Sequence, residues 1–352
     1  MKGKYLRDIL KTPQDIINKD GSYNVGIFDT YFKNLNFRDN KRPILRKFLN
    51  NQSLTEWQAV EVLLEDVFLM AAVFKFNLIN KSLFLLYDRK NKKLYDFSSQ
   101  SSFKNKSYVS STLENNSVSL RETDSSSIRI INELNHSMMH LEGYGNKDNN
   151  NLEFKIDFNV IANPSVFVFP MTEKNVVYTE KDFLKPEGFI RLNDKTYKTK
   201  ESDIAILDDH RGYYPLSSGY DWITSMCEIT LDGKKQKFGI NLTDFYKNSD
   251  PENFNENGYW LNEEFIHLPV VHFKRENNLW YIRDDLNTID LTFKNLEYVT
   301  QRSKHIFKID YMLAIGELSG TIKTYDNQVI KIDKVFSLGE KRVTQFLNKN
   351  IY

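Results

Sequence analysis

Apolar residues in this chain come in short runs that are separated by polar turns. Residues 57–64 are apolar at most positions, and valine is frequent among them. A short apolar run that is rich in β-branched residues is typical of a β-strand buried on both faces. Residues 67–78 and 81–87 continue the pattern, so they are predicted to form further buried strands.

The second half of the chain alternates strand-like segments with short polar turns. Asp232-Gly233 is a strong signal for a two-residue hairpin turn. Strands at this spacing predict an antiparallel sandwich or barrel. Short helices are expected only near residues 5–10 and 43–50, so the predicted fold class is all-β. The predicted hairpins span residues 189–197, 223–242, 270–282 and 321–332.

Residues 202–222 combine more chemically capable side chains than any other segment of the chain. An apolar run at residues 204–207 leads into a polar group. Gly212 is expected to make a sharp turn, because glycine tolerates positive φ. Tyr220 and Trp222 would share one face of a strand. The candidate catalytic residues are Asp208 and Arg211, and the candidate ligand-binding residues are Asp209, His210, Tyr214, Tyr220, Trp222 and Trp57.

Two interpretations of Asp208 and Arg211 are open from the residues alone. Burial among aromatic side chains disfavours the charged form of a carboxyl group, so Asp208 would hold its proton more tightly and act as a general acid. The alternative is that Asp208 and Arg211 form a structural ion pair that pins the turn, because structural networks also gather charges in this way.

Composition excludes some classes of protein and leaves others open. The 352 residues include 48 basic and 47 acidic side chains, which gives a net charge of +1. That balance argues against a dedicated nucleic-acid-binding protein, which would carry a basic face. Aromatic residues make up 14% of the chain, which suits both a packed sheet and a lined apolar cavity. Cys227 is the only cysteine, so an intrachain disulfide and a CxxC motif are excluded.

The sequence predicts a cytoplasmic protein. The N-terminal residues carry charges and no apolar segment typical of a secretory signal. The longest apolar run, at residues 67–74, is far shorter than the roughly 20 residues of a membrane-spanning helix. No transmembrane segment is therefore expected, whereas peripheral membrane contact stays open. The sequence carries no signal that fixes the oligomeric state.

No metal site or cofactor is predicted. Glu133, His136 and His140 have a spacing that would place them on one face of a helix. The surrounding residues indicate a strand instead, where positions 136 and 140 would lie roughly 13 Å apart. The chain also lacks a glycine-rich phosphate loop, a nucleophile elbow and a zincin helix. Gly316, Gly320 and Gly339 are expected at bulges or at close approaches of strands.

A series of features in a fixed order resembles the DUF2804 family of uncharacterised bacterial proteins, over roughly residues 12–346. No single feature is specific, and the match comes from their order and spacing. The features are Thr12-Pro13, the Asp20-Gly21 turn, Glu56-Trp57, Gly188 with the hairpin to Tyr197, Ile206-Leu207-Asp208 with Arg211-Gly212, Trp222, Gly316, Gly320, Asp326-Asn327 and Gly339-Glu340.

The resemblance has implications for the fold and for one residue. DUF2804 proteins are similar to the carotenoid hydratase and AttH group, which implies two lipocalin-like antiparallel β-barrel or sandwich modules packed side by side, with few short helices. The expected divisions are an N-terminal extension with short helices (1–48), a first module (49–185), a second module (186–346) and a C-terminal tail (347–352). In hydratases of that group an acidic residue protonates an alkene, and Asp208 occupies the matching position.

Three functional hypotheses follow. The first is a protein that binds a lipophilic small molecule, of lipid or isoprenoid type, in an aromatic-lined β cavity. The second is a hydratase, isomerase or cyclase that needs no cofactor and acts on a lipophilic alkene, with Asp208 as general acid. The third is a structural β module whose core is filled with side chains.

Overall fold

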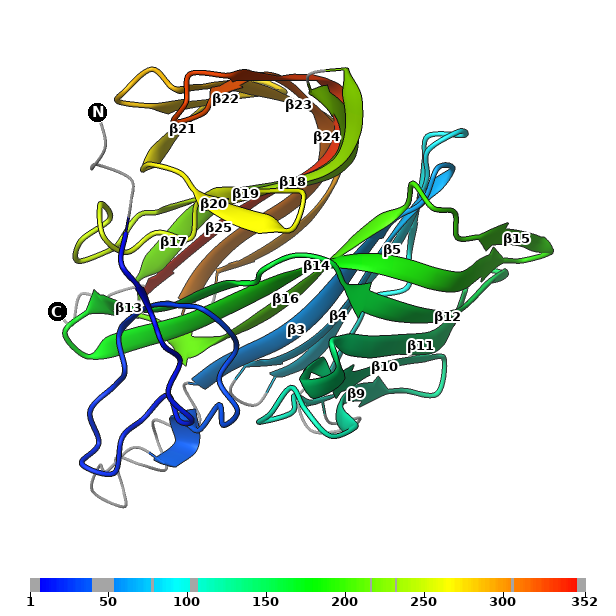
Figure 1. Ribbon diagram of the computed structural model, residues 1–352. Coiled ribbons are helices and arrows are strands. Elements are labelled where there is room, and N and C mark those ends of the chain that lie inside the picture. Colours follow the sequence, from blue (N-terminus) through cyan, green and yellow to red (C-terminus); the bar gives the residue numbers. More distant parts are fainter. Residues whose placement is uncertain are drawn as a thin grey trace, which may run out of the picture. The chain divides into compact units, whose positions relative to one another are not determined.

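Most of the described chain lies in β-strands and very little of it is helical, which confirms the predicted all-β fold class. Two turns of 3-10 helix, η1 (Phe37–Asp39) and η2 (Leu134–His136), are the helical segments of this part of the chain. No helix among the described residues is long and apolar enough to cross a membrane. The computed structural model (Figure 1) describes residues 7–39, 54–76, 79–101, 107–215, 217–231, 233–304 and 307–346.

The chain divides into two compact units, and each contains one curled, mainly antiparallel sheet. The larger unit consists of Ile9–Phe169 and Val176–Tyr213. The smaller unit consists of Met1–Asp8, Pro170–Asn175 and Tyr214–Tyr352.

The strands of the larger sheet follow the order β6-β5-β4-β3-β16-β14-β12-β11-β10-β9-β8, with β1, β2, β7, β13 and β15 attached beside this path. They are β1 (Ile9–Leu10), β2 (Gly26–Phe28), β3 (Leu54–Leu63), β4 (Val67–Phe76), β5 (Ile79–Asp88), β6 (Lys93–Asp96), β7 (Ser99–Ser101), β8 (Ser107–Tyr108), β9 (Ser117–Glu122), β10 (Ser126–Glu133), β11 (Met138–Lys147), β12 (Asn150–Val160), β13 (Ser165–Thr172), β14 (Asn175–Leu192), β15 (Lys195–Lys198) and β16 (Ile204–Tyr213).

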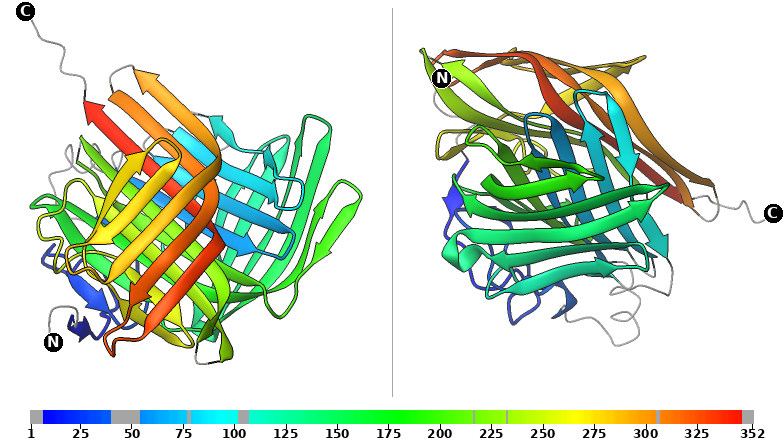
Figure 2. Two further views of the ribbon diagram at one scale, coloured as in Figure 1. Left: turned by 90° about the horizontal axis from the view of Figure 1, so that it is seen from above. Right: turned by 90° about the vertical axis from the view of Figure 1, so that its right-hand side faces the viewer.

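The strands of the smaller sheet follow the order β20-β19-β18-β17-β25-β24-β23-β22-β21, and the longest of them curl strongly (Figure 2). They are β17 (Ser218–Leu231), β18 (Lys234–Phe245), β19 (Gly258–Leu261), β20 (Glu264–His267), β21 (Val271–Glu276), β22 (Leu279–Asp284), β23 (Ile289–Lys304), β24 (Phe307–Lys323) and β25 (Val329–Phe346).

The four predicted hairpins all form. The hairpin at residues 189–197 joins β14 to β15, and the one at 223–242 joins β17 to β18. The hairpin at 270–282 joins β21 to β22, and the one at 321–332 joins β24 to β25. The expected role of Gly320 is also observed, because it lies at a bulge in the pairing of β24 with β25 with a φ of 138°.

The expected turn at Gly212 is wrong, because β16 continues through it to Tyr213. Gly212 is paired with Thr55 of β3 on one side and with Val177 of β14 on the other. A Cβ atom on Gly212 would lie 2.4 Å from a methyl group of Val177. The glycine is therefore explained by the close approach of β14 rather than by a turn.

The N-terminal segment from Ile9 onward belongs to the larger unit. Residues 9–10, expected in a short helix, instead form β1 and pair with β2, while residues 43–50 lie outside the described part of the chain. Phe32 and Phe37 of this segment are fully buried in the core of the larger unit. The boundary expected between residues 185 and 186 falls inside β14.

Strand alternation places one face of each sheet in an apolar core. In the larger unit Val60 and Val62 of β3 pair with Ala71 and Leu69 of β4, and all four are buried in one cluster. In the smaller unit the core contains Trp280, Phe293 and Ile223. Burial of each large apolar side chain contributes about 1.5–3 kcal/mol.

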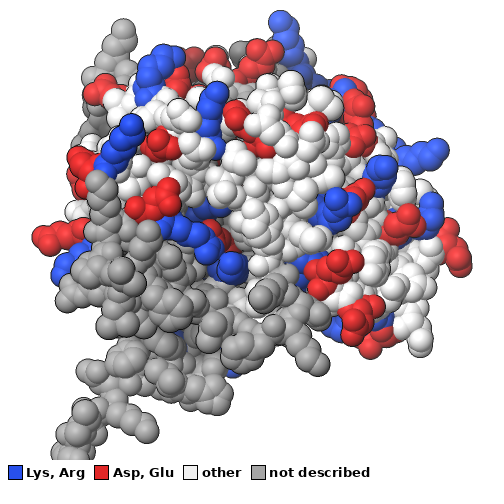
Figure 3. Space-filling model, turned by 90° about the horizontal axis from the view of Figure 1, so that it is seen from below, with Lys and Arg blue, Asp and Glu red and all other residues white. Residues whose placement is uncertain are grey.

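Charged residues of both signs are interspersed on the face shown in Figure 3. Uncharged areas separate them, and no extended region of one sign is seen on this face. This mixture agrees with the near-zero net charge of the chain.

Candidate functional site

The predicted motif at residues 208–211 is divided between the two faces of β16. Side chains alternate along a strand, so Asp208 and His210 lie on one face and Asp209 and Arg211 on the other. Asp209 and Arg211 share their face with Leu207, which belongs to the apolar core of the larger unit. The expected pair between Asp208 and Arg211 is therefore wrong: each makes a different ion pair.

Asp209 and Arg211 form a fully buried, two-point ion pair inside the larger unit. Arg211 Nε and Nη2 donate to the two carboxylate oxygens of Asp209, each over 2.8 Å. Burial raises the pKa of Asp209 despite the opposing effect of Arg211. Glu56 of β3 extends this cluster, because it binds Arg38 and its Oε1 lies 4.0 Å from Arg211 Nη1.

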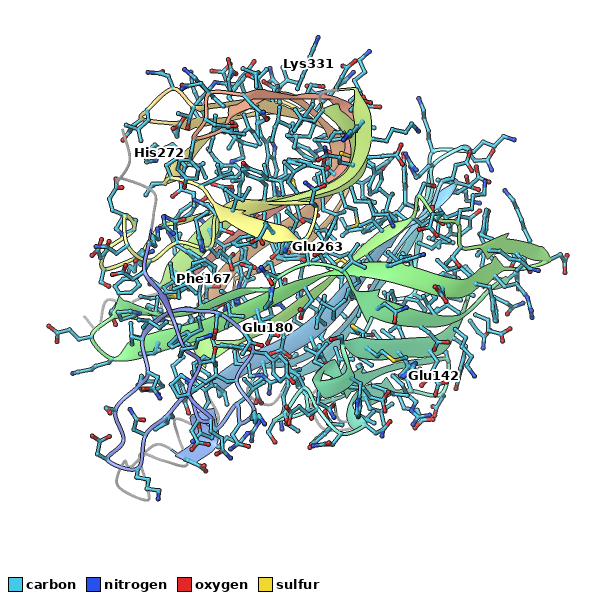
Figure 4. All side chains as sticks on the ribbon, viewed as in Figure 1. Glu142, Phe167, Glu180, Glu263, His272 and Lys331 are labelled. Atoms are coloured by element: carbon cyan, nitrogen blue, oxygen red, sulfur yellow. The ribbon has the colours of Figure 1, made fainter. Side chains whose placement is uncertain are left out.

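Strand β14 adds three polar side chains to the same interior face. Tyr178, Glu180 and Asp182 stand opposite Arg211, Asp209 and Leu207 of β16, respectively. The Tyr178 hydroxyl donates a hydrogen bond to Glu180 Oε2. Glu180 lies on β14 in Figure 4, and Asp182 follows it two residues later on the same face of the strand.

Burial dominates the protonation of these two carboxyl groups. It raises the pKa of Glu180 well above its ordinary value, and the neighbouring charge of Asp182 adds to the effect. It also raises the pKa of Asp182 to about 7. Desolvation disfavours a charged carboxylate, so this part of the interior favours the protonated acid.

A buried amide pair also crosses the interior of the larger unit. Gln58 Nε2 donates to Asn132 Oδ1 over 2.8 Å, and Asn132 Nδ2 donates back to Gln58 Oε1 over 3.3 Å. Both side chains are fully buried. Because each amide satisfies the other, the pair connects β3 to β10 without leaving its buried polar atoms unpaired.

The opposite face of β16, where the side chains are also buried, carries the other half of the predicted motif. Lys181 Nζ lies 3.2 Å from Asp208 Oδ1, and the indole nitrogen of Trp57 donates to Asp208 Oδ2 over 3.5 Å. The Trp57 ring stacks on His210 with a centroid distance of 4.0 Å. The structure thus brings together Asp208, His210 and Trp57, as the predicted site requires.

Tyr214, Tyr220 and Trp222 belong to the smaller unit rather than to the unit that contains Asp208. The hydroxyl of Tyr220 donates to Glu340. Burial, with the nearby charge of Glu340, raises the pKa of Tyr220 well above its ordinary value. Trp222 donates from its indole nitrogen to Asn241 Oδ1 over 2.7 Å.

A cavity of about 520 Å³ lies at one end of the larger unit, next to Glu56. Its walls come from the N-terminal segment, from β3 and β4, and from β8 with the residues that follow it. None of the eight predicted site residues lines it. The lining residues are Asp15, Asn34, Leu35, Asn36, Arg38, Asp39, Glu56, Lys75, Tyr108, Val109 and Ser111.

Glu133, His136 and His140 do not lie on one face of a helix. The short turn η2, which contains His136, separates the strands that carry the other two residues. His140 instead lies between Asp157 and Glu133, with nitrogen–oxygen distances of 2.6 and 3.1 Å. Across the described ranges no group of three or more His, Cys, Asp or Glu side chains is arranged to hold a metal ion.

Sequence reasoning missed Tyr178, Glu180 and Asp182, although a usable signal was present. Polar residues at positions i, i+2 and i+4 share one face of a strand. Glu56 and Gln58 repeat the i, i+2 spacing in β3. Such regular polar positions inside otherwise apolar strands indicate a polar network facing the core.

The chain belongs to the DUF2804 family, described as a domain of unknown function, whose family model matches residues 7–346. This confirms the resemblance seen in the sequence. No curated protein sequence matches the chain.

Comparison with solved structures identifies proteins of similar fold. The crystal structure of kievitone hydratase from Nectria haematococca is 12% identical, with a TM-score of 0.50, covering 92% of this chain and 98% of that one. The structure of CghA with Sch210972 is 7% identical, with a TM-score of 0.49, covering 84% and 89%. At such identity the likeness to kievitone hydratase concerns the fold.

Proposed function

We propose that the chain binds a lipophilic small molecule that carries at least one polar group, in the cavity of the larger unit. The cavity of about 520 Å³ is the observation that supports this proposal. Its volume falls within the roughly 300–1,000 Å³ that small-molecule sites occupy.

The cavity lining indicates which chemical groups the ligand needs. Leu35, Val109 and Tyr108 offer apolar contact, whereas most of the wall is polar and includes the charged residues Asp15, Arg38, Asp39, Glu56 and Lys75. Covering charged groups with a pure hydrocarbon would remove them from water without new hydrogen bonds, which is costly. A ligand with both an apolar body and a hydroxyl, carbonyl or carboxylate group avoids that cost.

Thermal unfolding with a panel of probes tests the proposal. Farnesol, palmitic acid and a saturated hydrocarbon of similar size represent polar-headed and purely apolar molecules. We expect the polar-headed probes to stabilise the protein, by about 2.7 kcal/mol at a hundred times their dissociation constant. Val109→Trp fills the cavity and should abolish the effect.

Val329→Trp provides a matched control, because Val329 is 55% exposed and lies in the smaller unit. It should leave the response to the probes unchanged. Equal stabilisation of the Val109→Trp protein would place the ligand elsewhere, and stabilisation by the hydrocarbon alone would contradict the requirement for a polar group.

A second candidate function is a hydratase, isomerase or cyclase that needs no cofactor and acts on a lipophilic alkene. Fully buried carboxyl groups with raised pKa values support proton transfer. The fold shared with kievitone hydratase is compatible with this class of reaction. Under this candidate Asp208 is the acid suggested by the sequence, oriented by Lys181 and Trp57.

Deuterium uptake tests the second candidate. Alkene-bearing isoprenoids are incubated with the protein in D2O, and mass spectrometry measures deuterium that becomes bonded to carbon. A general acid contributes about 10²–10⁴-fold, so Asp208→Asn should slow uptake by that factor if Asp208 is the acid. Full turnover by the Asp208→Asn protein would exclude Asp208 from this role.

A further inference from the structure

The interior carboxyl groups of the larger unit differ in whether a cation accompanies them. Asp209 is bound by Arg211, and Glu56 by Arg38. No Lys, Arg or His of the described residues forms an ion pair with Glu180 or Asp182. Both side chains are nevertheless buried, with exposed fractions of 0% and 3%.

The hydrogen bonds of the pair are incomplete if both groups are ionised. Glu180 Oε1 and Asp182 Oδ2 are buried and receive no N–H or O–H donor from the described part of the chain. Ionised carboxylates only accept hydrogen bonds, so two of them cannot bond to each other. Glu180 and Asp182 are two residues apart on β14 and therefore face the same side of the strand, where a proton held between them would supply the missing donor.

We propose that Glu180 and Asp182 form a proton-sharing carboxyl pair, a site that binds one proton inside the larger unit and serves as its acid group. The proposal goes beyond ligand binding, because it assigns an acid to a place that neither the sequence motif nor the cavity identifies. Two carboxyl groups at close range repel each other when both are ionised, and a pair of this kind therefore keeps a proton.

The groups around the pair strengthen this assignment. On β14 Tyr178 donates to Glu180, and on β16 the charge of Asp209 disfavours ionisation of both carboxyl groups. Arg211 is committed to Asp209, and Tyr31 of the N-terminal segment donates to Glu114. Strand β13, which also pairs with β14, carries no titratable side chain. No cation is therefore directed at the pair.

A second proton on the pair links the fold of the larger unit to pH. The pKa of Asp182 is about 7 in the folded chain and has an ordinary value of 3.8, while the pKa of Glu180 is raised well above its ordinary value. Above about pH 7 the folded pair therefore holds one proton, and below it a second one, which the unfolded chain loses already near pH 4. The stability that the second proton contributes is full below about pH 4 and is lost as pH rises to about 7, and over this range its loss increases the unfolding constant about tenfold per pH unit.

Infrared spectroscopy of the full chain at pH 8, above the pKa of about 7 of Asp182, tests the proposal without any ligand. A protonated carboxylic acid has a carbonyl band distinct from that of a carboxylate. We expect such a band in the wild type and its loss in both Asp182→Asn and Glu180→Gln. Each variant keeps the size of the pair and its net charge, because a neutral amide replaces the protonated acid. The new amide donates a hydrogen bond to the remaining carboxylate in place of the shared proton.

Glu142→Gln is the matched control, because Glu142 lies on a partly exposed face and pairs with Arg129. The band should persist in that variant. A wild-type spectrum without a protonated acid would overturn the proposal even if a variant failed to fold. A band that survives in both Asp182→Asn and Glu180→Gln would assign the proton to another group and overturn it equally.

Discussion

The two units place their charged side chains at different depths. In the larger unit Asp209 and Arg211 are both fully buried. In the smaller unit Asp221 pairs with Arg275 over 2.7 Å on the same face as the core residue Ile223, but the Arg275 side chain is 27% exposed. One sheet thus encloses a complete ion pair, whereas the other keeps one partner in contact with water.

The smaller unit also keeps polar side chains in its interior, beside an apolar core that contains Trp280 and Phe293. Asn241 and Asn257 are fully buried, and Glu256 is 3% exposed. Enclosing charges costs several kcal/mol per ion before their attraction is counted. The larger unit meets that cost for both members of an ion pair, whereas the smaller unit leaves the arginine of its pair partly exposed.

Replacing the arginine of each interior ion pair should give the largest difference between the units in the free energy of unfolding. Arg211→Met leaves Asp209 as an uncompensated buried charge, and we expect a loss of about 3–5 kcal/mol in the free energy of unfolding. Arg275→Met should cost about 1–2 kcal/mol, because Asp221 keeps its hydrogen bond from the Tyr246 hydroxyl over 2.7 Å. Urea unfolding measures both.

Arg129→Met is the control for loss of a charge at the surface. Arg129 pairs with Glu142 on a partly exposed face, so this change should cost less than about 1 kcal/mol. Equal losses for Arg211→Met and Arg275→Met would contradict the distinction between the two interiors.

The pH dependence of stability should be the next largest effect. The wild type should lose about 1.4 kcal/mol per pH unit relative to Asp182→Asn between about pH 4 and pH 7, because only in the wild type does the folded chain keep a proton on residue 182 that the unfolded chain has lost. Urea unfolding at several pH values measures the difference. Parallel profiles for the two proteins would show that Asp182 does not carry the proton.

Substitutions of the two tryptophans that were predicted to line one site should show the smallest difference in their effect on the free energy of unfolding. Trp222→Phe removes a 2.7 Å hydrogen bond and leaves the buried Asn241 oxygen without that donor, which costs about 1–3 kcal/mol. Trp57→Phe removes a 3.5 Å contact to Asp208, which Lys181 still neutralises. Its cost should be smaller by about 1 kcal/mol, and a larger cost would contradict the geometry.

Local sequence patterns predicted the fold well and the site only in part. Turn residues such as Asp326-Asn327 set the hairpins, because their backbone preferences act over two or three positions. Pairing of β16 with β3 joins residues about 150 positions apart, and no local pattern reports it. Gly212 was misread as a turn for the same reason, since its neighbour Val177 is distant in sequence.

The candidate site illustrates the same limit. Asp208, His210 and Trp57 were expected together, and cross-strand pairing brings them together. Arg211 was grouped with Asp208 because a turn was assumed, whereas a continuous strand directs adjacent side chains to opposite faces. Glu180 became visible only when β14 was seen to lie beside β16.

The most direct test of the account is native mass spectrometry of the protein purified from its source organism, followed by organic extraction of any bound molecule. The account predicts one small molecule per chain, lipophilic but with a polar group, that is retained by Val329→Trp and absent from Val109→Trp. A wild-type protein that is empty and takes up nothing from an extract of the same cells would contradict it, as would equal occupancy in the Val109→Trp protein.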